Sequence, residues 1–310
     1  MRSSEICALV TPEVERTIQD FFSLAPLHNP PNLAGIRAAE RFFPDIPHVA
    51  VFDTAFHQSM PEHAYMYALP YALYAEERVR RYGFHGTSHR FVAGRAAQLL
   101  GKPEGFTGVT CHLGNGCSLA AVRCGRSVDT SMGLTPLEGV PMGTRCGDID
   151  PAAVLHLMEH RQLGIGAMND LLNKQSGMLG LAETGSNDLR DILAARDAGN
   201  PQAAVALQAF CYRIKKYIGS YAAAMGGLDV LVFTAGIGEN SPEVRRRVCR
   251  GLEAPGGLGI ALDPSKNSSR THLARSVHAE GSRVRVLVIP TNEELEIARE
   301  TLQLVIGIAA

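Results

Sequence analysis

The chain has 310 residues, which is more than one hydrophobic core usually holds, so we expect two domains. Hydrophobic residues make up 45% of it, enough for a large core, and this composition excludes a disordered protein. The formal charge of −1 provides no basic field for nucleic acid or for an anionic membrane. The seven cysteines include no Cys-x-x-Cys pair, which favours the reducing cytoplasm. The sequence shows no signal-type or bilayer-length apolar segment, so we expect a soluble protein.

Four apolar runs rich in β-branched residues predict buried strands, and helix-like stretches separate them, so the chain reads as an α/β protein. The runs are 48–52, 107–113, 228–234 and 284–289. Polar residues follow each run, namely Asp53, then His112 and Asn115, then Glu239 and Asn240, and finally Asn292 and Glu293. Because open α/β sheets bind ligands at the carboxyl ends of their strands, we expect the functional site there.

The helix signals are clearest in the second half of the chain. Asp150-Pro151 and Ser241-Pro242 each place a capping side chain before a proline, and they predict helices over 152–160 and 244–250. The stretch 201–225 is apolar on one face and is long enough for a major core helix.

Two glycine-containing segments at strand ends are candidates for a phosphate site. The segment 112–116, His-Leu-Gly-Asn-Gly, predicts a tight hairpin between strands 107–113 and 117–123, and its amides and Asn115 suit a phosphate. The segment 235–240 reads as a glycine loop between a strand and a helix, where backbone N–H groups can approach a nucleotide. An ordinary hairpin and a geometric glycine turn are the alternatives, but two such segments together favour a bipartite phosphate site.

Three side chains are candidates for the chemistry. His85 has glycine neighbours that bring the backbone close to a ligand, at a helix start that Thr87 or Ser88 would cap, with His89 as a capping or packing residue. Arg145 lies in a polar loop and can reach a phosphoryl group, or pair instead with Asp148 or Asp150. Asp53 can hold a metal or orient an arginine.

Other charged residues have plainer interpretations from local sequence. Glu293 reads as a first-turn helix acid that is favourable to the helix dipole. The arginines at 245, 246, 247 and 250 read as one solvated helix face, and no site is assigned to them. The sequence also lacks a Walker A loop and a Rossmann fingerprint, so the commonest nucleotide-binding motifs are excluded.

Taken together, the motifs resemble the acetate kinase family. The blocks that carry the resemblance occur in the family's order at 24–30, 51–57, 83–89, 112–116, 142–145, 233–240 and 290–295. The resemblance implies an α/β, actin-like or sugar-kinase-like (ribonuclease H-like) fold whose two domains close over ATP. It also implies reversible transfer of a phosphoryl group from ATP to acetate by direct in-line attack, giving acetyl phosphate and ADP, with Mg²⁺ (or Mn²⁺) and a homodimer.

Residue roles follow from the same resemblance, position by position. Asp53, His85 and Arg145 would be catalytic, and Glu293 would be a Mg²⁺ ligand. The nucleotide would be bound by His112, Leu113, Gly114, Asn115, Gly116, Asp188, Leu189, Arg190, Gly236, Ile237, Gly238, Glu239 and Asn240. Leu27, Phe84 and Pro136 would line a small pocket for the methyl group of the substrate.

The start of the sequence departs from the family pattern. The Asn-x-Gly-Ser-Ser-Ser-x-Lys and His-Arg-x-x-His-Gly-Gly segments of acetate kinases are absent. We therefore expect residues 1–57 to be the remainder of a first domain, completed by a C-terminal helix over 295–310, and residues 58–294 to form the nucleotide-binding and dimerisation domain. A propionate kinase, and a non-catalytic remnant that only binds nucleotide or dimerises, are the alternatives, while a sugar or glycerol kinase fits the motifs less well.

Overall fold

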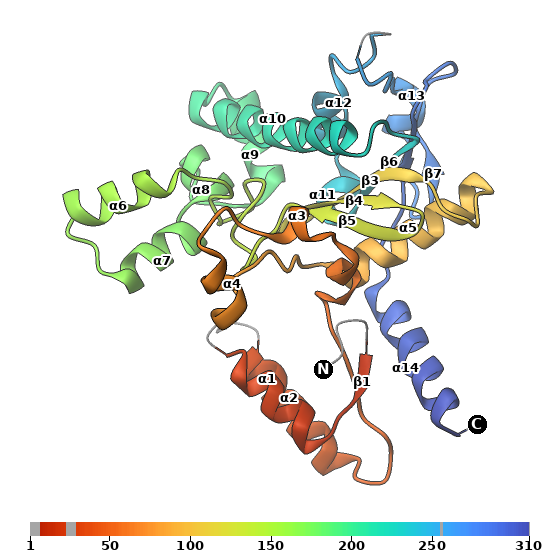
Figure 1. Ribbon diagram of the computed structural model, residues 1–310. Helices are drawn as coiled ribbons and strands as arrows, with labels where there is room; N and C mark the ends of the chain where they lie inside the picture. The colour runs from red at the N-terminus through yellow and green to blue at the C-terminus, as the bar shows by residue number, and fades with distance from the viewer. Residues whose placement is uncertain (1–6, 23–28, 255–256, 310) are drawn as a thin grey trace.

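A six-stranded mixed sheet with the strand order β5-β4-β3-β6-β8-β7 forms the centre of the molecule in the computed structural model, which describes residues 7–22, 29–254 and 257–309 (Figure 1). Strands β3 (Thr107–Leu113), β4 (Cys117–Arg123) and β5 (Arg126–Thr130) are antiparallel neighbours. Strands β6 (Val230–Thr234) and β8 (Arg285–Val288) run parallel to β3, with the short β7 (Arg275–Ser276) at the edge. The carboxyl ends of β3, β6 and β8 therefore meet at one end of the sheet.

The two faces of this sheet are covered by different helices. Alternate side chains of the strands, such as Leu231 and Phe233, face helix α10 (Pro201–Ala224) and share its core with Phe210. Their neighbours, such as Val232, face helix α5 (Gly86–Leu100). In Figure 1, α10 and α5 lie on opposite sides of the sheet. Burial on both faces explains why these strands read as continuous apolar runs.

The remaining helices surround this layered centre. The second half contributes α6 (Pro151–His160), α7 (Ile165–Lys174), α8 (Gly177–Ala182), α9 (Leu189–Asp197), α11 (Ala235–Asn240), α12 (Pro242–Cys249) and α13 (Pro264–Ser268). Before α5 lie a 3₁₀ helix (Ala55–Ser59), α3 (Glu62–Tyr65) and α4 (Tyr71–Glu77). The side chains of Asp150 and Ser241 accept from the backbone N–H groups of Ala152 and Val244, so both predicted proline caps are confirmed.

A second, two-stranded sheet lies apart from the first. Strands β1 (Cys7–Leu9) and β2 (Val49–Val51) pair antiparallel, and helices α1 (Pro12–Asp20) and α2 (Asn29–Phe42) connect them. Helix α14 (Glu293–Ala309) starts just beyond β8 and runs to this small sheet (Figure 1). It is fixed to α5 by Arg90, which pairs with Glu296 at 3.1 Å and Glu300 at 2.5 Å. Among the described helices, none is both long and apolar enough to cross a membrane.

Candidate active site

Asp53 caps helix α5 from a distant part of the sequence. Its Oδ2 accepts from the backbone N–H of His85 at 2.7 Å, and its Oδ1 accepts from the N–H of Thr87 at 3.3 Å. The first N–H groups of a helix lack intrahelical partners, and a carboxylate satisfies them and complements the dipole. His85 is the N-cap residue, with a φ of 55°, and its side chain makes no cap hydrogen bond. The expectation that Thr87 or Ser88 caps this helix is therefore wrong.

The His85 ring is held against the central sheet by two neighbours. Its Nδ1 lies 2.9 Å from Oγ of Ser118 on β4, and the ring stacks on His112 with centroids 4.1 Å apart. His112 is anchored in turn, because its Nδ1 lies 2.8 Å from Oγ of Ser88. Burial lowers the pKa of His112 to about 3, so this ring is neutral at physiological pH. Two histidines thus lie side by side at the carboxyl end of β3.

Arg145 and His85 approach the same point of the hairpin loop. A Cβ added to Gly116 would lie 3.2 Å from Nε2 of His85 and 3.7 Å from Nη1 of Arg145. The same Nη1 donates to the Pro136 carbonyl at 3.1 Å. Desolvation lowers the pKa of Arg145, but the ordinary pKa of a guanidinium is so high that the group stays charged. A cationic fork and an imidazole therefore face one glycine, where only a hydrogen stands in place of a side chain.

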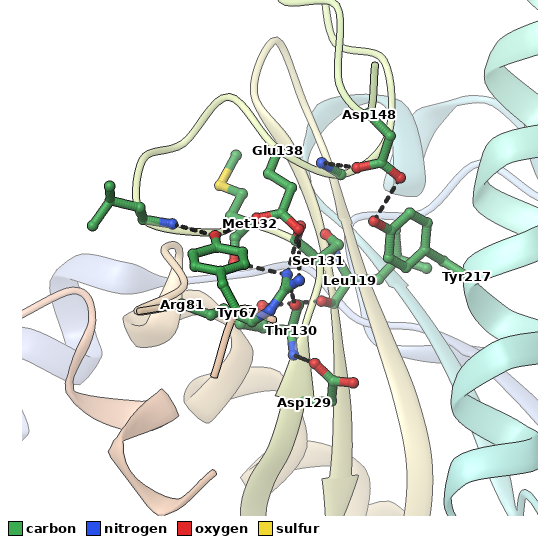
Figure 2. A network of polar contacts seen from close by, with 12 residues as sticks. Tyr67, Arg81, Leu119, Asp129, Thr130, Ser131, Met132, Glu138, Asp148 and Tyr217 are labelled. Carbon is green, nitrogen blue, oxygen red and sulfur yellow. Dashed lines mark hydrogen bonds and ion pairs between the residues drawn. The ribbon is translucent and has the colours of Figure 1, made fainter. Parts of the chain in front are cut away.

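The loop that carries Arg145, residues 131–149, has neither helix nor strand and is fixed by a polar network (Figure 2). Arg81 donates to Glu138 Oε1 at 2.6 Å and to the Thr130 carbonyl at 2.7 Å. Tyr67 donates to the other Glu138 oxygen at 2.5 Å. These contacts hold both ends of the segment that contains Pro136, the residue whose carbonyl accepts from Arg145.

Neither acidic residue considered as an ion-pair partner holds Arg145. The Asp148 carboxylate accepts from the N–H of Gly139 and from the hydroxyl of Tyr217, both at 2.8 Å (Figure 2). Asp150 caps α6, as described above. Both carboxylates are thus committed elsewhere, which leaves the Arg145 guanidinium without a neutralising partner among the described residues.

The predicted nucleotide segments surround this point. The predicted 112–116 hairpin is confirmed, and the Gly143 N–H donates to the Asn115 carbonyl at 2.9 Å. Asn187 donates to Asn115 Oδ1 at 2.8 Å, so the segment 188–190 begins beside this loop. There Asp188 caps α9 and pairs with Arg190 at 2.5 Å, and the Arg190 side chain is 88% exposed. The hairpin, the Arg145 loop and the start of α9 therefore border one region.

The segment 235–240 differs from its prediction as a loop. It forms the short helix α11, which starts directly at the carboxyl end of β6. A Cβ added to Gly114 would lie 3.8 Å from the Ala235 Cβ, so the two glycine-containing segments are neighbours. Glu239 is turned toward the end of β8, where its Oε1 accepts from the Thr291 N–H at 3.2 Å. The predicted pairing of the two segments is thus seen, with a helix start in place of an open loop.

Arg245 is fully buried, which overturns the expectation that residues 245, 246, 247 and 250 form one solvated face. Its guanidinium donates to the Gly238 carbonyl at 2.7 Å and to both the side chain and the carbonyl of Asn267, each at 2.7 Å. Burial lowers the pKa of Arg245 to about 10, so the group remains charged. Val244 and Val248 on the same helix are buried as well. Arg245 therefore lies on the side of α12 that faces the protein interior.

We expect Arg245→Met to lower the free energy of unfolding by about 3 kcal/mol. The substitution keeps much of the volume but leaves the buried Gly238 and Asn267 acceptors without donors, and each unsatisfied group costs about 1–3 kcal/mol. Urea unfolding measures the change. Arg246→Met is the matched control, because that side chain is 55% exposed and its loss should cost about 0.5 kcal/mol at most. Equal stability of the two variants would contradict this account.

Two carboxylates, those of Glu293 and Asp53, are close enough to interact electrostatically, and Glu293 follows the carboxyl end of β8. Glu293 is the first residue of α14, so its interpretation as a first-turn helix acid is confirmed. Burial, and then the charge of Asp53, raise the pKa of Glu293. Such a carboxylate pair fits a hard divalent cation, which would reduce the repulsion. Among the described residues there is no group of three or more His, Cys, Asp or Glu placed to hold a metal. Any Mg²⁺ here would therefore need phosphate oxygens and water as further ligands.

The predicted methyl pocket is only partly described. Phe84 precedes His85 and packs against the core, and its carbonyl lies 3.1 Å from His57 Nε2. Pro136 lies beside Arg145 through its carbonyl. Leu27 is outside the described residues.

Two residues that contact the site, Ser118 and Asn187, were not predicted from the sequence. The serine among the apolar residues of strand 117–123 was a usable signal for the first of them.

The strand ends of this α/β sheet bring together carboxylates, a guanidinium and amide-rich segments, which are the groups that a phosphotransferase uses. A model of the acetokinase family matches residues 3–299. The chain is 58% identical to an acetate kinase of Nitratidesulfovibrio vulgaris over 289 residues, which are 93% of this chain and 71% of that protein. It is 57% identical to an acetate kinase of Leifsonia xyli over 298 residues, 96% and 74% of the two chains. The chain belongs to the acetokinase family.

Solved structures agree with this assignment. The acetate kinase of Porphyromonas gingivalis superposes with a TM-score of 0.91 at 46% identity, over 98% of this chain and 75% of that one. A propionate kinase of Francisella tularensis superposes with a TM-score of 0.88 at 41% identity, over 95% and 74%. The predicted actin-like, sugar-kinase-like α/β fold is confirmed.

Proposed function

We propose that the chain is an acetate kinase, an ATP-dependent phosphotransferase that reversibly converts ATP and acetate into ADP and acetyl phosphate. The observation that carries this proposal is the approach of Arg145 and His85 to Gly116, beside the amides of the hairpin loop. An acetate oxygen attacks the terminal phosphorus in line, and the bond to ADP breaks, with its electron pair leaving on ADP. Acetate is already ionised at neutral pH, so no base has to remove a proton.

Repulsion between two anions is the main obstacle to this reaction. The transferring group spreads negative charge over its equatorial oxygens, and preorganised cations and donors lower the barrier. Arg145 supplies a charged fork there, and His85 supplies a ring nitrogen on the same side of Gly116. Asp53, whose carboxylate accepts two α5 N–H groups, acts in this proposal as an orienting group near the transferred phosphoryl.

Mg²⁺, with Mn²⁺ as an alternative, is part of the proposal. Glu293 would hold the ion with Asp53 nearby, because a divalent cation would relieve the repulsion between the two carboxylates. When bound, the ion neutralises charge on the phosphate oxygens. The nucleotide would be bound by the segments 112–116, 188–190 and 236–240, which border one region as described above.

The acceptor pocket distinguishes acetate from propionate. We assign Phe84 and Pro136 to its lining because each adjoins a site residue, and Leu27 belongs to the same proposal. One additional methylene in such a pocket changes the free energy by only about 1–3 kcal/mol, so a propionate kinase is the second candidate. The similarity to a propionate kinase structure supports keeping it.

The test is an assay of acyl phosphate formation with ATP and Mg²⁺, using acetate, propionate and butyrate in parallel. We expect acetate to have the highest kcat/KM, about tenfold or more above propionate. A preference for propionate would select the second candidate. Saturable ATP binding without acyl phosphate in any reaction would select a non-catalytic nucleotide-binding protein.

Domain organisation and assembly complete the proposal. We assign residues 1–57 and 295–310 to one domain and 58–294 to the other, and the separation of the two sheets supports this division. A homodimer is supported by helices α6 and α7, which project from the body of the molecule in Figure 1 and expose Leu155 by 67% and Ile165 by 82%. A cytoplasmic location is also proposed. Light scattering on the purified protein tests the dimer.

A further inference from the structure

A chain of side-chain hydrogen bonds runs through the sheet behind His85. Thr110 Oγ1 lies 2.7 Å from His89 Nδ1, and His89 Nε2 lies 2.7 Å from Ser118 Oγ. The same Ser118 oxygen lies 2.9 Å from His85 Nδ1. Thr110, His89 and Ser118 are all fully buried, so each polar hydrogen in the chain requires an acceptor within it.

Only one arrangement of hydrogens meets that requirement with neutral rings. Within the described chain, Thr110 Oγ1 has no hydrogen-bond partner other than His89, so its hydroxyl must donate to His89 Nδ1. His89 then carries its hydrogen on Nε2 and donates to Ser118. Among the residues that the structure describes, the two imidazoles are the only side-chain partners of the Ser118 hydroxyl, so it donates to His85 Nδ1.

The alternatives leave a buried hydroxyl unsatisfied. If His89 carried its hydrogen on Nδ1, the Thr110 hydroxyl would have no acceptor. If His85 carried a hydrogen on Nδ1, Ser118 would receive two donors, and its own hydrogen would have none. Each buried unsatisfied donor costs about 1–3 kcal/mol. A charged His89 is disfavoured too, because burial and three neighbouring histidines hold its pKa well below the usual value.

We propose that Ser118 and His89 are positioning residues that hold His85 as the neutral tautomer with hydrogen on Nε2. The Nε2 edge faces Gly116 and Arg145, so this tautomer directs a donor toward the place proposed for the transferring phosphoryl group. The other tautomer would direct a lone pair at phosphate oxygens and repel them. This inference rests on the proposed function for its effect on rate, but the tautomer itself is a property of the protein alone.

The first test is direct observation of the His85 ring nitrogens by NMR in ¹⁵N-histidine-labelled protein at neutral pH. The His85→Gln variant assigns the signals. We expect a protonated Nε2 and an unprotonated, hydrogen-bonded Nδ1 in the wild type, and a mixture of tautomers in Ser118→Ala. Ser127→Ala is the matched control, because it removes another fully buried hydroxyl that contacts a histidine, His57 at 2.8 Å. It should leave the His85 signals unchanged.

The second test separates the hydrogen bond from the packing of His89. In His89→Gln the side-chain amide can take the place of Nε2 and still donate to Ser118, whereas the shorter His89→Asn cannot reach it. We expect Ser118→Ala and His89→Asn to lower kcat by about 10- to 100-fold with little change in KM, and His89→Gln to retain most of the rate.

Several outcomes would overturn the inference. A wild-type His85 with hydrogen on Nδ1 or on both nitrogens would do so, as would an unchanged tautomer in Ser118→Ala. Equal loss of kcat in His89→Gln and His89→Asn would reduce His89 to a packing residue. An inactive wild type with the expected Nε2 tautomer would instead contradict the proposed function, and it would still support the assigned hydrogen-bond chain from Thr110 to His85.

Discussion

Turnover is expected to fall by about 10³-fold or more when Arg145 is replaced by alanine, with a much smaller change in the affinity for ATP. The guanidinium is partly desolvated, is not neutralised by a carboxylate among the described residues, and lies beside Gly116 with His85. A charge held in such a position stabilises the transition state without reorganising, and the substrate gains it only during transfer. Initial rates of acetyl phosphate formation at saturating ATP and acetate measure the effect.

Two further variants make this result specific. Arg145→Lys keeps a positive charge but loses the planar fork, so an intermediate rate is expected. Arg95→Ala removes an exposed arginine on α5 whose side chain contacts Gln98, and it should leave the rate unchanged. A loss of less than tenfold in Arg145→Ala would remove this residue from the chemical step.

The second large effect is expected from Gly86→Ala, which should lower the free energy of unfolding by about 2–3 kcal/mol and remove most activity. An added Cβ would collide with the carbonyl oxygen of Asp53 and would lie 3.2 Å from the Cβ of Phe56. The obstacle is backbone, so the start of α5 would have to move away from Asp53. That shift would break the cap and displace His85 together with it.

Gly94→Ala on the same helix is the matched control. Nothing lies within 4 Å of a Cβ at this position, and alanine is the better helix former. We therefore expect Gly94→Ala to raise the free energy of unfolding by about 0.5–1 kcal/mol at unchanged rate. Thermal and urea unfolding of the two variants provide the comparison, and a Gly86→Ala protein as stable as Gly94→Ala would refute the close approach.

Local patterns predicted those parts of the fold that local physics determines. Asn115-Gly116 predicted the hairpin that joins 107–113 to 117–123, although neither residue adopts the positive φ that motivated the prediction. The capping residues Asp150 and Ser241 placed two helices correctly, since a cap and its helix are adjacent in sequence. The segment 235–240 was missed as a helix because its glycines disfavour one, and contacts with distant residues, the sheet strands and Arg245, stabilise it.

Local patterns did not predict the contacts within the site that join residues distant in sequence. Asp53 and His85 are 32 positions apart, and nothing in either segment indicates that one caps the other. The burial of Arg245 depends on Asn267, which lies 22 residues further along the chain. Local sequence made Asp53, His85 and Arg145 candidates, whereas their catalytic roles and the metal-ligand role of Glu293 were implied by the resemblance to a family, and all four roles stay predictions until the variants are measured.

Helix α14 connects the candidate active site with the smaller sheet. Its first residue is Glu293, it is fixed to α5 through Arg90, and it continues to the β1–β2 sheet. A helix is stiff over such a length, about 1.5 Å per residue. The helix therefore ties the position of the Glu293 carboxylate to the smaller sheet at one end and, through Arg90, to the helix that carries His85 at its start.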